Sequence, residues 1–480
     1  MDNFSEWLNL LKIQYQQLSD EERNLTLDCL ISTSGASQLW HLCNHIEQLR
    51  YRDFIKLLPP ELREYVLCYL DGKSLLKACC VSRTWNQLIS SSTRTWQHAC
   101  ISLGLVINNY LNSTDSSYWK SYFIEMMNRI AEMKMGNCFI SKIYERHLRR
   151  VTAVYYSAGR LATASDSKTI QLWDCHKDEC LLTLRTDASV AAIMFDEELL
   201  IVSSYLGHLV SWDLATGQRL MEYFRHVGAV FTFDYCKDLN IVVSGSADTR
   251  IKIWSLQQGN MITTLQGHSL WVLKVLLRPF NQTGINDEQI YHLFSMDKAN
   301  IMVWMLQAHQ PKTLTVTSLY TIPTCGKEAN LFTPGLHFDG NFLFFMKQDA
   351  NASAYLCKWD VNLKKMDLEV SLKCNVKVLL GVGQKYAAIM TPWPSKGVPN
   401  FIVFDLTTLE NVALWHLPPS RPSTPDCSQM TLGDCRWLDG LDGKNDQGVL
   451  LAAGLDDNTV YVVKWCPRIE EETLPHLPET

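Results

Sequence analysis

The spacing of hydrophobic residues divides the chain into two parts near residue 139. Before that point apolar residues recur every three or four positions, as in Phe4, Trp7, Leu8 and Leu11, and this spacing predicts amphipathic helices. Ser19 followed by Glu22 predicts a capping box at a helix start. After residue 139 short runs of period two alternate with turn residues, so this part predicts strands.

A repeat organises the second part. Strands that end in Trp recur at Trp173, Trp212, Trp254, Trp304, Trp359 and Trp465, and Phe404 holds the same place in one further unit. The fullest unit, residues 224–268, resembles the WD-repeat pattern, in which each unit forms a four-stranded blade. Seven units therefore predict a seven-bladed β-propeller. We expect residues 139–144 to supply the outer strand of the last blade, because the segment after Trp465 provides no convincing one.

The third unit contains His226, Ser244, Asp248 and Trp254, a set that includes the residues of a catalytic triad. The resemblance to WD repeats implies instead that these four form a buried hydrogen-bond network within the blade. In units one, two and four the position six residues before Trp is Ser167, Leu206 and Lys298. We therefore expect only the third blade to keep the whole network.

Residues 51–100 resemble an F-box. Leu58 and Pro59 open the segment, Leu62, Val66 and Leu70 form a helical stripe, and Asp71-Gly72 ends that helix before Leu75 begins the next. A box of about 45 residues buries too little apolar area to be stable alone, so partner helices must complete its surface. We expect Val81, Trp85 and Ile89 to be core.

An F-box joined to WD repeats is similar to the F-box/WD-repeat family, the substrate receptors of SCF-type ubiquitin ligases. The resemblance implies a Skp-type adaptor, and through it cullin and RING subunits, as partners. It places the adaptor contacts at Leu58, Pro59, Leu62, Val66, Leu70 and Leu75. It implies a multidomain α plus all-β protein, with a helical segment over 1–50, the F-box over 51–100, a helical linker over 101–138, the propeller over 139–467 and an acidic tail over 468–480. The alternative is a WD-repeat scaffold without a role in ubiquitylation.

Composition excludes several other classes. A net charge of −6 argues against nucleic acid as the main partner, and no apolar run reaches the roughly 18 residues that span a bilayer. Without a secretion signal the 16 cysteines should be reduced, which predicts a cytoplasmic or nuclear protein. Cys175, His176 and Cys180 lack a second ligand cluster, so we expect no metal. No nucleophile and base are paired, so the sequence predicts a non-catalytic receptor subunit without a cofactor.

The residues that bind the substrate can be assigned to specific positions of the repeats. In relatives that read phosphorylated segments, several positions on the top rim of the propeller are Arg. Here the corresponding positions include Arg150, Tyr205 and Trp271, together with the acids Asp166 and Asp297. We therefore expect a protein substrate that is basic, neutral or singly phosphorylated, with an aromatic anchor.

The stripe of Phe4, Trp7, Leu8 and Leu11 predicts a homodimer, with packing on the box as the alternative.

Overall fold

A computed structural model of the chain describes residues 2–50, 53–103, 116–135, 139–144, 147–157, 160–175, 177–224, 226–280, 290–309, 313–324, 335–348, 354–372, 378–382, 386–390, 401–415, 431–432, 449–454 and 460–465. These residues form two compact units, Met1–Ser92 and Thr93–Thr480. The acidic tail predicted over 468–480 lies outside the described residues. None of the described helices has a stretch long and apolar enough to cross a membrane.

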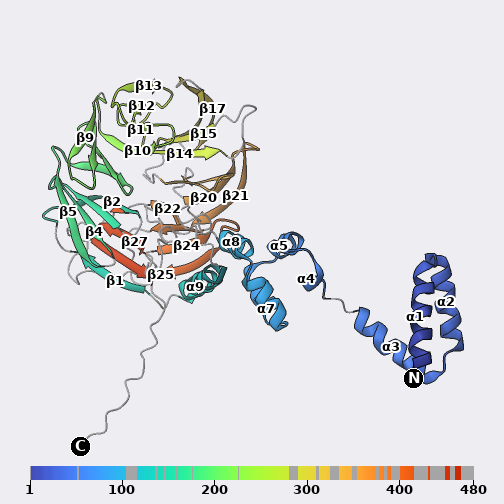
Figure 1. The fold of residues 1–480 in the computed structure, drawn as a ribbon. Coiled ribbons are helices and arrows are strands. Elements are labelled where there is room, and N and C mark those ends of the chain that lie inside the picture. Colours follow the sequence, from blue (N-terminus) through green and yellow to red (C-terminus); the bar gives the residue numbers. More distant parts are fainter. Residues whose placement is uncertain are drawn as a thin grey trace, which may run out of the picture. The chain divides into compact units, whose positions relative to one another are not determined.

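The described helices all precede the strands (Figure 1). They are α1 (Asp2–Gln17), α2 (Asp20–Thr33), α3 (Ala36–Arg50), α4 (Phe54–Leu57), α5 (Pro60–Cys68), α6 (Gly72–Cys79), α7 (Arg83–Ser90), α8 (Thr93–Ser102) and α9 (Ser116–Met135). The predicted capping box is confirmed at the start of α2, where the Ser19 hydroxyl accepts from the Glu22 amide and the Glu22 carboxylate accepts from the Ser19 amide. Arg23 then ties α2 to α1 by donating to the carbonyl of Tyr15.

The second part of the chain consists of four-stranded antiparallel sheets, seven among the described residues. We number the sheets 1 to 7 along the chain. Their strands are, in sheet 1, β2 (Val151–Ser157), β3 (Arg160–Ser165), β4 (Thr169–Asp174) and β5 (Glu179–Arg185); in sheet 2, β6 (Val190–Phe195), β7 (Leu199–Ser204), β8 (His208–Asp213) and β9 (Arg219–Phe224); in sheet 3, β10 (Val230–Cys236), β11 (Ile241–Ser246), β12 (Ile251–Ser255) and β13 (Met261–Leu265); in sheet 4, β14 (Lys274–Phe280), β15 (Ile290–Met296), β16 (Asn300–His309) and β17 (Thr313–Pro323); in sheet 5, β18 (Leu336–Phe338), β19 (Phe342–Gln348), β20 (Ala354–Asp360) and β21 (Lys365–Leu372); in sheet 6, β22 (Val378–Val382), β23 (Tyr386–Met390), β24 (Phe401–Asp405) and β25 (Asn411–Trp415); and in sheet 7, β1 (Phe139–Tyr144), β28 (Val460–Trp465), β27 (Val449–Gly454) and β26 (Thr431–Leu432).

The sheets stand side by side and are in contact through the first strand of each of sheets 1 to 6 and through β26 of sheet 7. Strand β2 contacts β6 and β26, and further contacts join β6 to β10, β10 to β14, β14 to β18 and β18 to β22 (Figure 1). The core consists of apolar layers between successive sheets, such as the cluster of Ile253, Leu277 and Leu293 between sheets 3 and 4. This layering explains why neither face of a central strand is exposed: β11 is buried along its whole length.

Sheet 7 combines the two ends of the strand region. Strand β1 pairs antiparallel with β28, with Phe139 opposite Trp465 and Tyr144 opposite Val460. The prediction that residues 139–144 supply the outer strand of the last unit is therefore confirmed. Tyr144 reinforces the junction with sheet 1, because its ring stacks on Trp173 at 4.6 Å and its hydroxyl donates to Asp178 at 2.7 Å.

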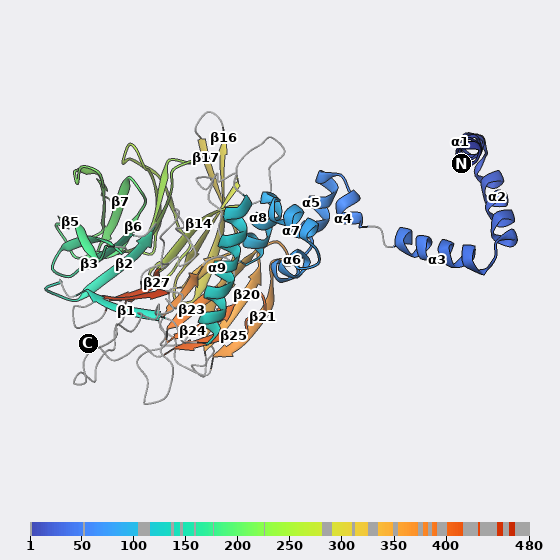
Figure 2. The same cartoon turned by 60° about the horizontal axis from the view of Figure 1, so that its bottom comes forward.

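Helices α8 and α9 belong to the same unit as the sheets. Trp96 of α8 is fully buried and packs on Phe123 of α9, with ring centroids 5.5 Å apart. Helix α9 in turn lies against β25, the last strand of sheet 6 (Figure 2). Trp96 falls within residues 51–100, the predicted F-box, but it is part of a helical pair that belongs to the sheet unit.

Candidate interaction surfaces

The F-box region has a small core of its own. Trp85 of α7 donates its indole N–H to both carboxylate oxygens of Asp53, at 2.9 and 3.0 Å, and Asp53 also caps α4 through the amide of Lys56. Residues that this core buries include Ile55, Leu67, Leu75, Ala78 and Ile89. The box therefore has a defined internal packing, although it is small.

A stripe of apolar side chains on this box faces outward. Leu62, Val66 and Leu70 are 54%, 42% and 37% exposed. Pro59 is also exposed and Leu58 is half-buried. We call these five residues the box stripe. Exposed apolar side chains that recur every four residues along one helix are typical of a surface that another protein covers.

Three residues of the box differ from expectation. Leu75 is fully buried, so its side chain packs inside the box and does not fit the predicted adaptor contact. Val81, expected in the core, is 65% exposed, and Trp85 is half-buried. Ile89 is fully buried, as a core residue should be. Helical spacing identifies which residues share a face, but it does not say which face lies inward in helices of eight or nine residues.

The exposed surface of the box is larger than its sequence pattern indicated. Phe54, Leu57, Tyr65 and Tyr69 are exposed as well, and the hydroxyls of Tyr65 and Tyr69 lie 2.7 Å apart. The hydrogen bond between them raises the pKa of Tyr69 above its ordinary value, and burial adds to this rise. Sequence reasoning missed these residues because Tyr and Phe in short helices are equally typical of a core.

The N-terminal helices expose nearly all of their apolar side chains. Phe4, Trp7, Leu8 and Leu11 of α1 are exposed, and the rings of Phe4 and Trp7 stack at 5.6 Å. Helix α2 buries no residue. A helix with an apolar stripe and nothing over it needs another surface to cover that stripe.

Sheet 3 contains the four-residue network in full. His226 places Nδ1 2.8 Å from the Asp248 carboxylate and Nε2 2.8 Å from the Ser244 hydroxyl, which also accepts the indole N–H of Trp254 at 2.8 Å. Burial acts to raise the pKa of Asp248, but the bond from His226 and two backbone amides outweigh it and hold that pKa at about 2. Ser244 is fully buried with its hydroxyl occupied, so it cannot act as a nucleophile.

Sheet 4 contains a second complete network, which corrects the expectation that only the third unit keeps it. His268 bonds Asp297 at 2.7 Å and Ser295 at 2.8 Å, and Ser295 accepts from Trp304 at 2.9 Å. Asp297 lies seven residues before Trp304, whereas Asp248 lies six before Trp254. The acid was missed because Asp297 directly follows β15 and lies one residue farther from its tryptophan than Asp248 does, so counting back six residues reaches Lys298 instead.

Sheet 1 keeps only part of the network. In sheet 1 His147 and Trp173 both bond the hydroxyl of Thr163, at 2.7 and 3.1 Å. The acid is absent from the network, and His147 Nδ1 is buried without a partner among the described residues. Burial lowers the pKa of His147 to about 4.

The predicted substrate residues Tyr205 and Trp271 lie at the end of the sheets that also contains the histidines of the networks. Phe231 joins these two residues, because its ring lies 6.4 Å from that of Tyr205 and 5.6 Å from that of Trp271. We call Tyr205, Phe231 and Trp271 the aromatic chain. Tyr205 and Trp271 are exposed and Phe231 is half-buried. Sequence reasoning missed Phe231, whose neighbours come from two different loops.

The charge of this rim also differs from expectation. Asp297 is fully buried in the network of sheet 4, so it is no rim acid that could repel a phosphate. Asp166 remains half-buried and lies near Tyr205 together with Arg150: burial raises the pKa of Tyr205, the charge of Arg150 lowers it, and that of Asp166 raises it. The same turns and loops carry exposed cations at Arg149, Lys168, Arg250 and Lys298.

The part of the chain that the structure describes contains no group of three or more His, Cys, Asp or Glu side chains that could hold an ion. Cys175 is buried, and His176 lies outside the described residues.

Comparison with known proteins agrees with this architecture. A family model described as F-box-like matches residues 55–102, and one described as WD domain, G-beta repeat matches residues 217–255. The chain is 34% identical over 468 residues to F-box/WD repeat-containing protein 2 of Homo sapiens and to that of Rattus norvegicus, which covers 96% of this chain and 98% of each relative. It is also 26% identical over 196 residues, 34% of this chain and 29% of the relative, to the probable E3 ubiquitin ligase complex SCF subunit sconB of Arthroderma otae. An F-box with an exposed apolar stripe, four-stranded sheets with WD-type networks and near full-length similarity lead to one assignment: the chain belongs to the F-box/WD-repeat family.

Proposed function

We propose that the chain is the substrate-recognition subunit of an SCF-type ubiquitin ligase. The box stripe binds the Skp-type adaptor, and the end of the sheets that carries the aromatic chain binds the protein to be ubiquitylated. The chain performs no chemistry: it raises the effective concentration of the target near the conjugating enzyme. The observation that carries the proposal is the exposed box stripe on a box that has its own core.

Co-purification with the adaptor tests this function. We expect the wild-type chain to retain stoichiometric adaptor and Leu62→Asp/Val66→Asp to lose it, because two buried charges oppose the interface. The matched control is Leu363→Asp/Leu368→Asp, which places two charges on exposed leucines of the sheet unit and should leave adaptor binding intact. If the wild type retains no adaptor, the result favours a WD-repeat scaffold over a ubiquitin ligase receptor.

The sheets of this receptor close into a seven-bladed propeller. Contacts between first strands already connect sheet 7 to sheet 1 and then each sheet to the next as far as sheet 6. A junction between sheets 6 and 7 completes the ring and removes the last free edges. Hydrogen exchange of β22 and β26 as slow as that of β10 would support closure, and fast exchange confined to those strands would contradict it.

The substrate segment binds along the aromatic chain. Exposed Trp and Tyr side chains supply large contact areas at a low entropic cost and dominate many interfaces. The exposed cations nearby, and the burial of Asp297, fit a segment that is neutral or carries a single phosphate better than a basic one. A peptide array in which only multiply phosphorylated sequences bound would contradict this assignment.

The helices of residues 2–50 mediate homodimerisation through the stripe of Phe4, Trp7, Leu8 and Leu11, which has no cover among the described residues. Light scattering of the intact chain should give the mass of a dimer, and Trp7→Ala/Leu11→Ala should give that of a monomer. An unchanged monomeric mass in both samples would favour packing of the stripe on the box.

A further inference from the structure

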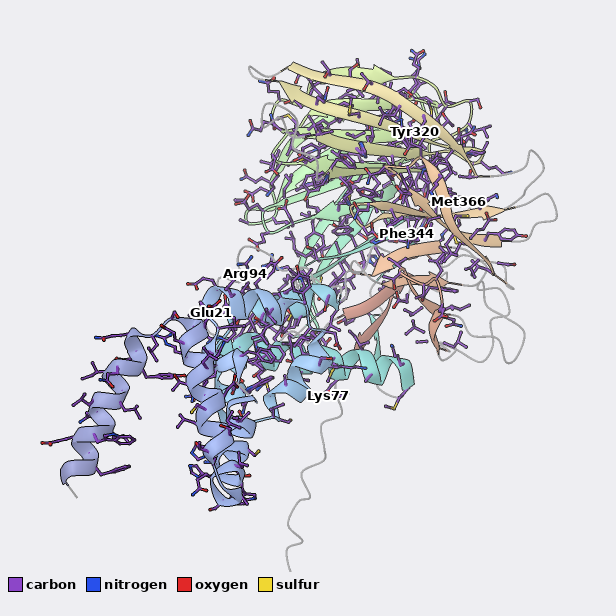
Figure 3. The ribbon with its side chains drawn as sticks, turned by 90° about the vertical axis from the view of Figure 1, so that its right-hand side faces the viewer. Glu21, Lys77, Arg94, Tyr320, Phe344 and Met366 are labelled. Carbon is purple, nitrogen blue, oxygen red and sulfur yellow. The ribbon has the colours of Figure 1, made fainter. Side chains whose placement is uncertain are left out.

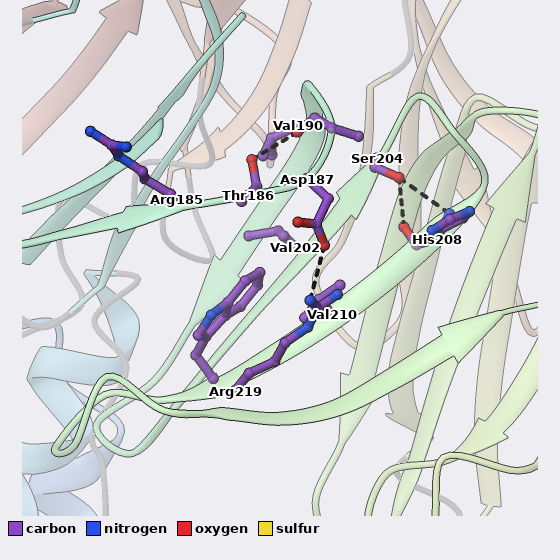
Figure 4. Close-up of a pocket in the computed structure, with 11 residues that line it drawn as sticks. Arg185, Thr186, Asp187, Val190, Val202, Ser204, His208, Val210 and Arg219 are labelled. Carbon is purple, nitrogen blue, oxygen red and sulfur yellow. Dashed lines mark hydrogen bonds and ion pairs between the residues drawn. The ribbon is translucent and has the colours of Figure 1, made fainter. Parts of the chain in front are cut away.

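Sheet 2 contains a hollow next to the start of β6. It encloses about 440 Å³ when the space open to solvent is included. Its floor is apolar, formed by Val190, Val202 and Val210, and Trp212 closes one side. Figure 4 shows the polar side chains around this floor, among them Thr186, Asp187 and Arg219.

The hollow occupies the place where other sheets hold their histidine. His147 and His226 each lie four residues before the first residue of their sheet, at Val151 and Val230. Thr186 lies four residues before Val190 in the same way. A threonine in place of an imidazole leaves room for a ring of that size.

The hydroxyl of the network is also missing from this sheet. Ser244 stands two residues after Val242, the residue that pairs with Trp254, and Val202 stands two residues after Leu200, which pairs with Trp212. Val202 therefore replaces the acceptor that the tryptophan needs.

Trp212 is consequently left with an unused donor. Its side chain is 95% buried, since only 5% of the residue is exposed, yet its indole N–H has no acceptor among the described residues. In sheets 1, 3 and 4 the same N–H donates to a hydroxyl at 3.1, 2.8 and 2.9 Å. Because Trp212 lines the hollow, this donor is accessible from it, and an occupant that supplies an acceptor would form a bond that the protein itself does not make.

The charges around the hollow narrow the class of occupant. Arg219 pairs with Asp187 at 2.9 Å and also with Glu222, so its charge is already neutralised. Thr186 donates its hydroxyl to the carbonyl of Ala188 at 2.7 Å and has no free proton to offer. At Arg219 a phosphate or carboxylate would have to displace these acids, whereas a neutral ring with one acceptor and one donor would not. Arg185, the other cation of the lining, is exposed.

We propose that this hollow binds a histidine side chain of the captured protein. One ring nitrogen accepts the indole N–H of Trp212, and the other donates to Asp187. The ring takes the place that His226 fills in sheet 3, but it contacts the tryptophan directly because Val202 supplies no hydroxyl between them. The turn of Ser204 to His208 flanks the hollow and contains Tyr205, whose amide donates to Ser189 at 3.1 Å. The hollow is thus a specific subsite beside the aromatic chain, and this inference rests on the proposed receptor function.

Fluorine NMR of the full chain labelled with 5-fluorotryptophan tests the chemistry of the hollow directly. The probe is 4-methylimidazole, the side-chain analogue of histidine, at a pH where it is neutral; toluene and acetate are the comparisons. We expect a saturable shift of the signal that Trp212→Phe removes, and no such shift with toluene or acetate. An equal response to toluene would make the hollow a purely apolar cavity, and a response to acetate alone would make it an anion site; either result overturns the proposal.

A filled variant provides the control. Thr186→His/Val202→Ser supplies the imidazole and the hydroxyl from the chain itself, so the Trp212 signal should no longer respond to 4-methylimidazole. Should that variant fold poorly, Trp212→Phe, which keeps an aromatic ring and removes the donor, serves as the control in the peptide measurement described next. Adaptor co-purification of the wild type and both variants monitors the F-box independently. Failure of the wild type to retain the adaptor would contradict the receptor function, not the subsite.

Displayed random peptides then test whether the occupant is part of a protein. Peptides selected on the wild-type chain bound to its adaptor should be enriched in histidine, and their affinity should fall by about tenfold on Trp212→Phe, as expected for one buried hydrogen bond. Selected peptides without histidine enrichment, or peptides that bind the filled variant as tightly as the wild type, would overturn the assignment.

Discussion

The two units of this molecule use their hydrophobic residues in opposite ways. In the sheets, strands such as β11 are buried along their length, and large side chains such as Phe344 are fully covered (Figure 3). In residues 2–92 many of the large apolar side chains are exposed, and α2 buries none. The sheet unit has an extensive core, whereas the first unit has only the small core of its box and leaves many apolar side chains uncovered among the described residues. A comparison of the two therefore separates folding from assembly within one chain.

The largest expected effect is protection of the first unit by the adaptor. Amides of α5 and α6 should exchange quickly in the free chain and about a thousandfold more slowly at an adaptor concentration of about 1,000 times Kd, which corresponds to about 4.1 kcal/mol. Amides of β11 should not change. The measurement is hydrogen exchange by mass spectrometry on the full chain.

A control identifies the surface responsible. Leu62→Asp/Val66→Asp should abolish the protection of α5, and Leu363→Asp/Leu368→Asp should preserve it. If α5 and β11 exchange equally slowly without adaptor, the first unit is self-sufficient and the comparison fails.

Acid should weaken the sheet unit before it affects exposed helices. Burial lowers the pKa of both His147 and His292 to about 4. The unfolded chain binds protons near pH 6.5, so these groups leave stability intact above that value and reduce it as the pH falls from 6.5 toward 4. At pH 5.5 the two together should cost roughly 3 kcal/mol.

Urea denaturation followed by tryptophan fluorescence at pH 7.5 and 5.5 measures this loss. His292→Phe should remove about half of it, because the ring stacks on Phe280 at 4.2 Å and a phenyl group can keep that contact without titrating. An identical pH dependence in the variant would show that His292 does not titrate in this range.

The complete networks should stabilise their sheets measurably. Ser295→Ala removes the acceptor of Trp304 and the partner of His268, so two buried polar groups lose a hydrogen bond and the free energy of unfolding should fall by about 2 kcal/mol. Ser203→Ala is the matched control. Its hydroxyl is buried without a partner among the described residues, and its removal should change stability by less than about 0.5 kcal/mol. Equal effects of the two variants would argue that the network of sheet 4 contributes nothing beyond packing.

The sequence predicts much of this architecture because its signals are local. Period-two runs that end in Trp predict the strands, and Ser19 with Glu22 predicts a helix start. Even the pairing of β1 with β28 followed from the need to cover a free edge. Each of these inferences depends on neighbours in the chain or on a general rule of sheets.

The interaction surfaces were harder to predict because they depend on which residues meet in space. Phe231 joins Tyr205 to Trp271 across two loops, and no spacing along the chain reveals that contact. Asp297 was placed on the rim because it lies one residue before the position counted back from Trp304, but its side chain points inward and bonds His268. Leu75 is a residue type that is common in interfaces, but it lies on the buried side of its helix.

The smallest expected effect concerns the junction that joins the ends of the sheet unit. Tyr144→Phe keeps the stack on Trp173 and removes only the bond from its hydroxyl to Asp178, so the free energy of unfolding should fall by about 1 kcal/mol. Tyr223→Phe removes a bond of similar length, 2.8 Å, to the carbonyl of Leu256. Because that acceptor is neutral, we expect a smaller loss for Tyr223→Phe than for Tyr144→Phe. Urea midpoints of the two variants measure the difference, and a loss at Tyr223 without any loss at Tyr144 would mean that the junction of β1 with sheet 1 does not hold the unit together.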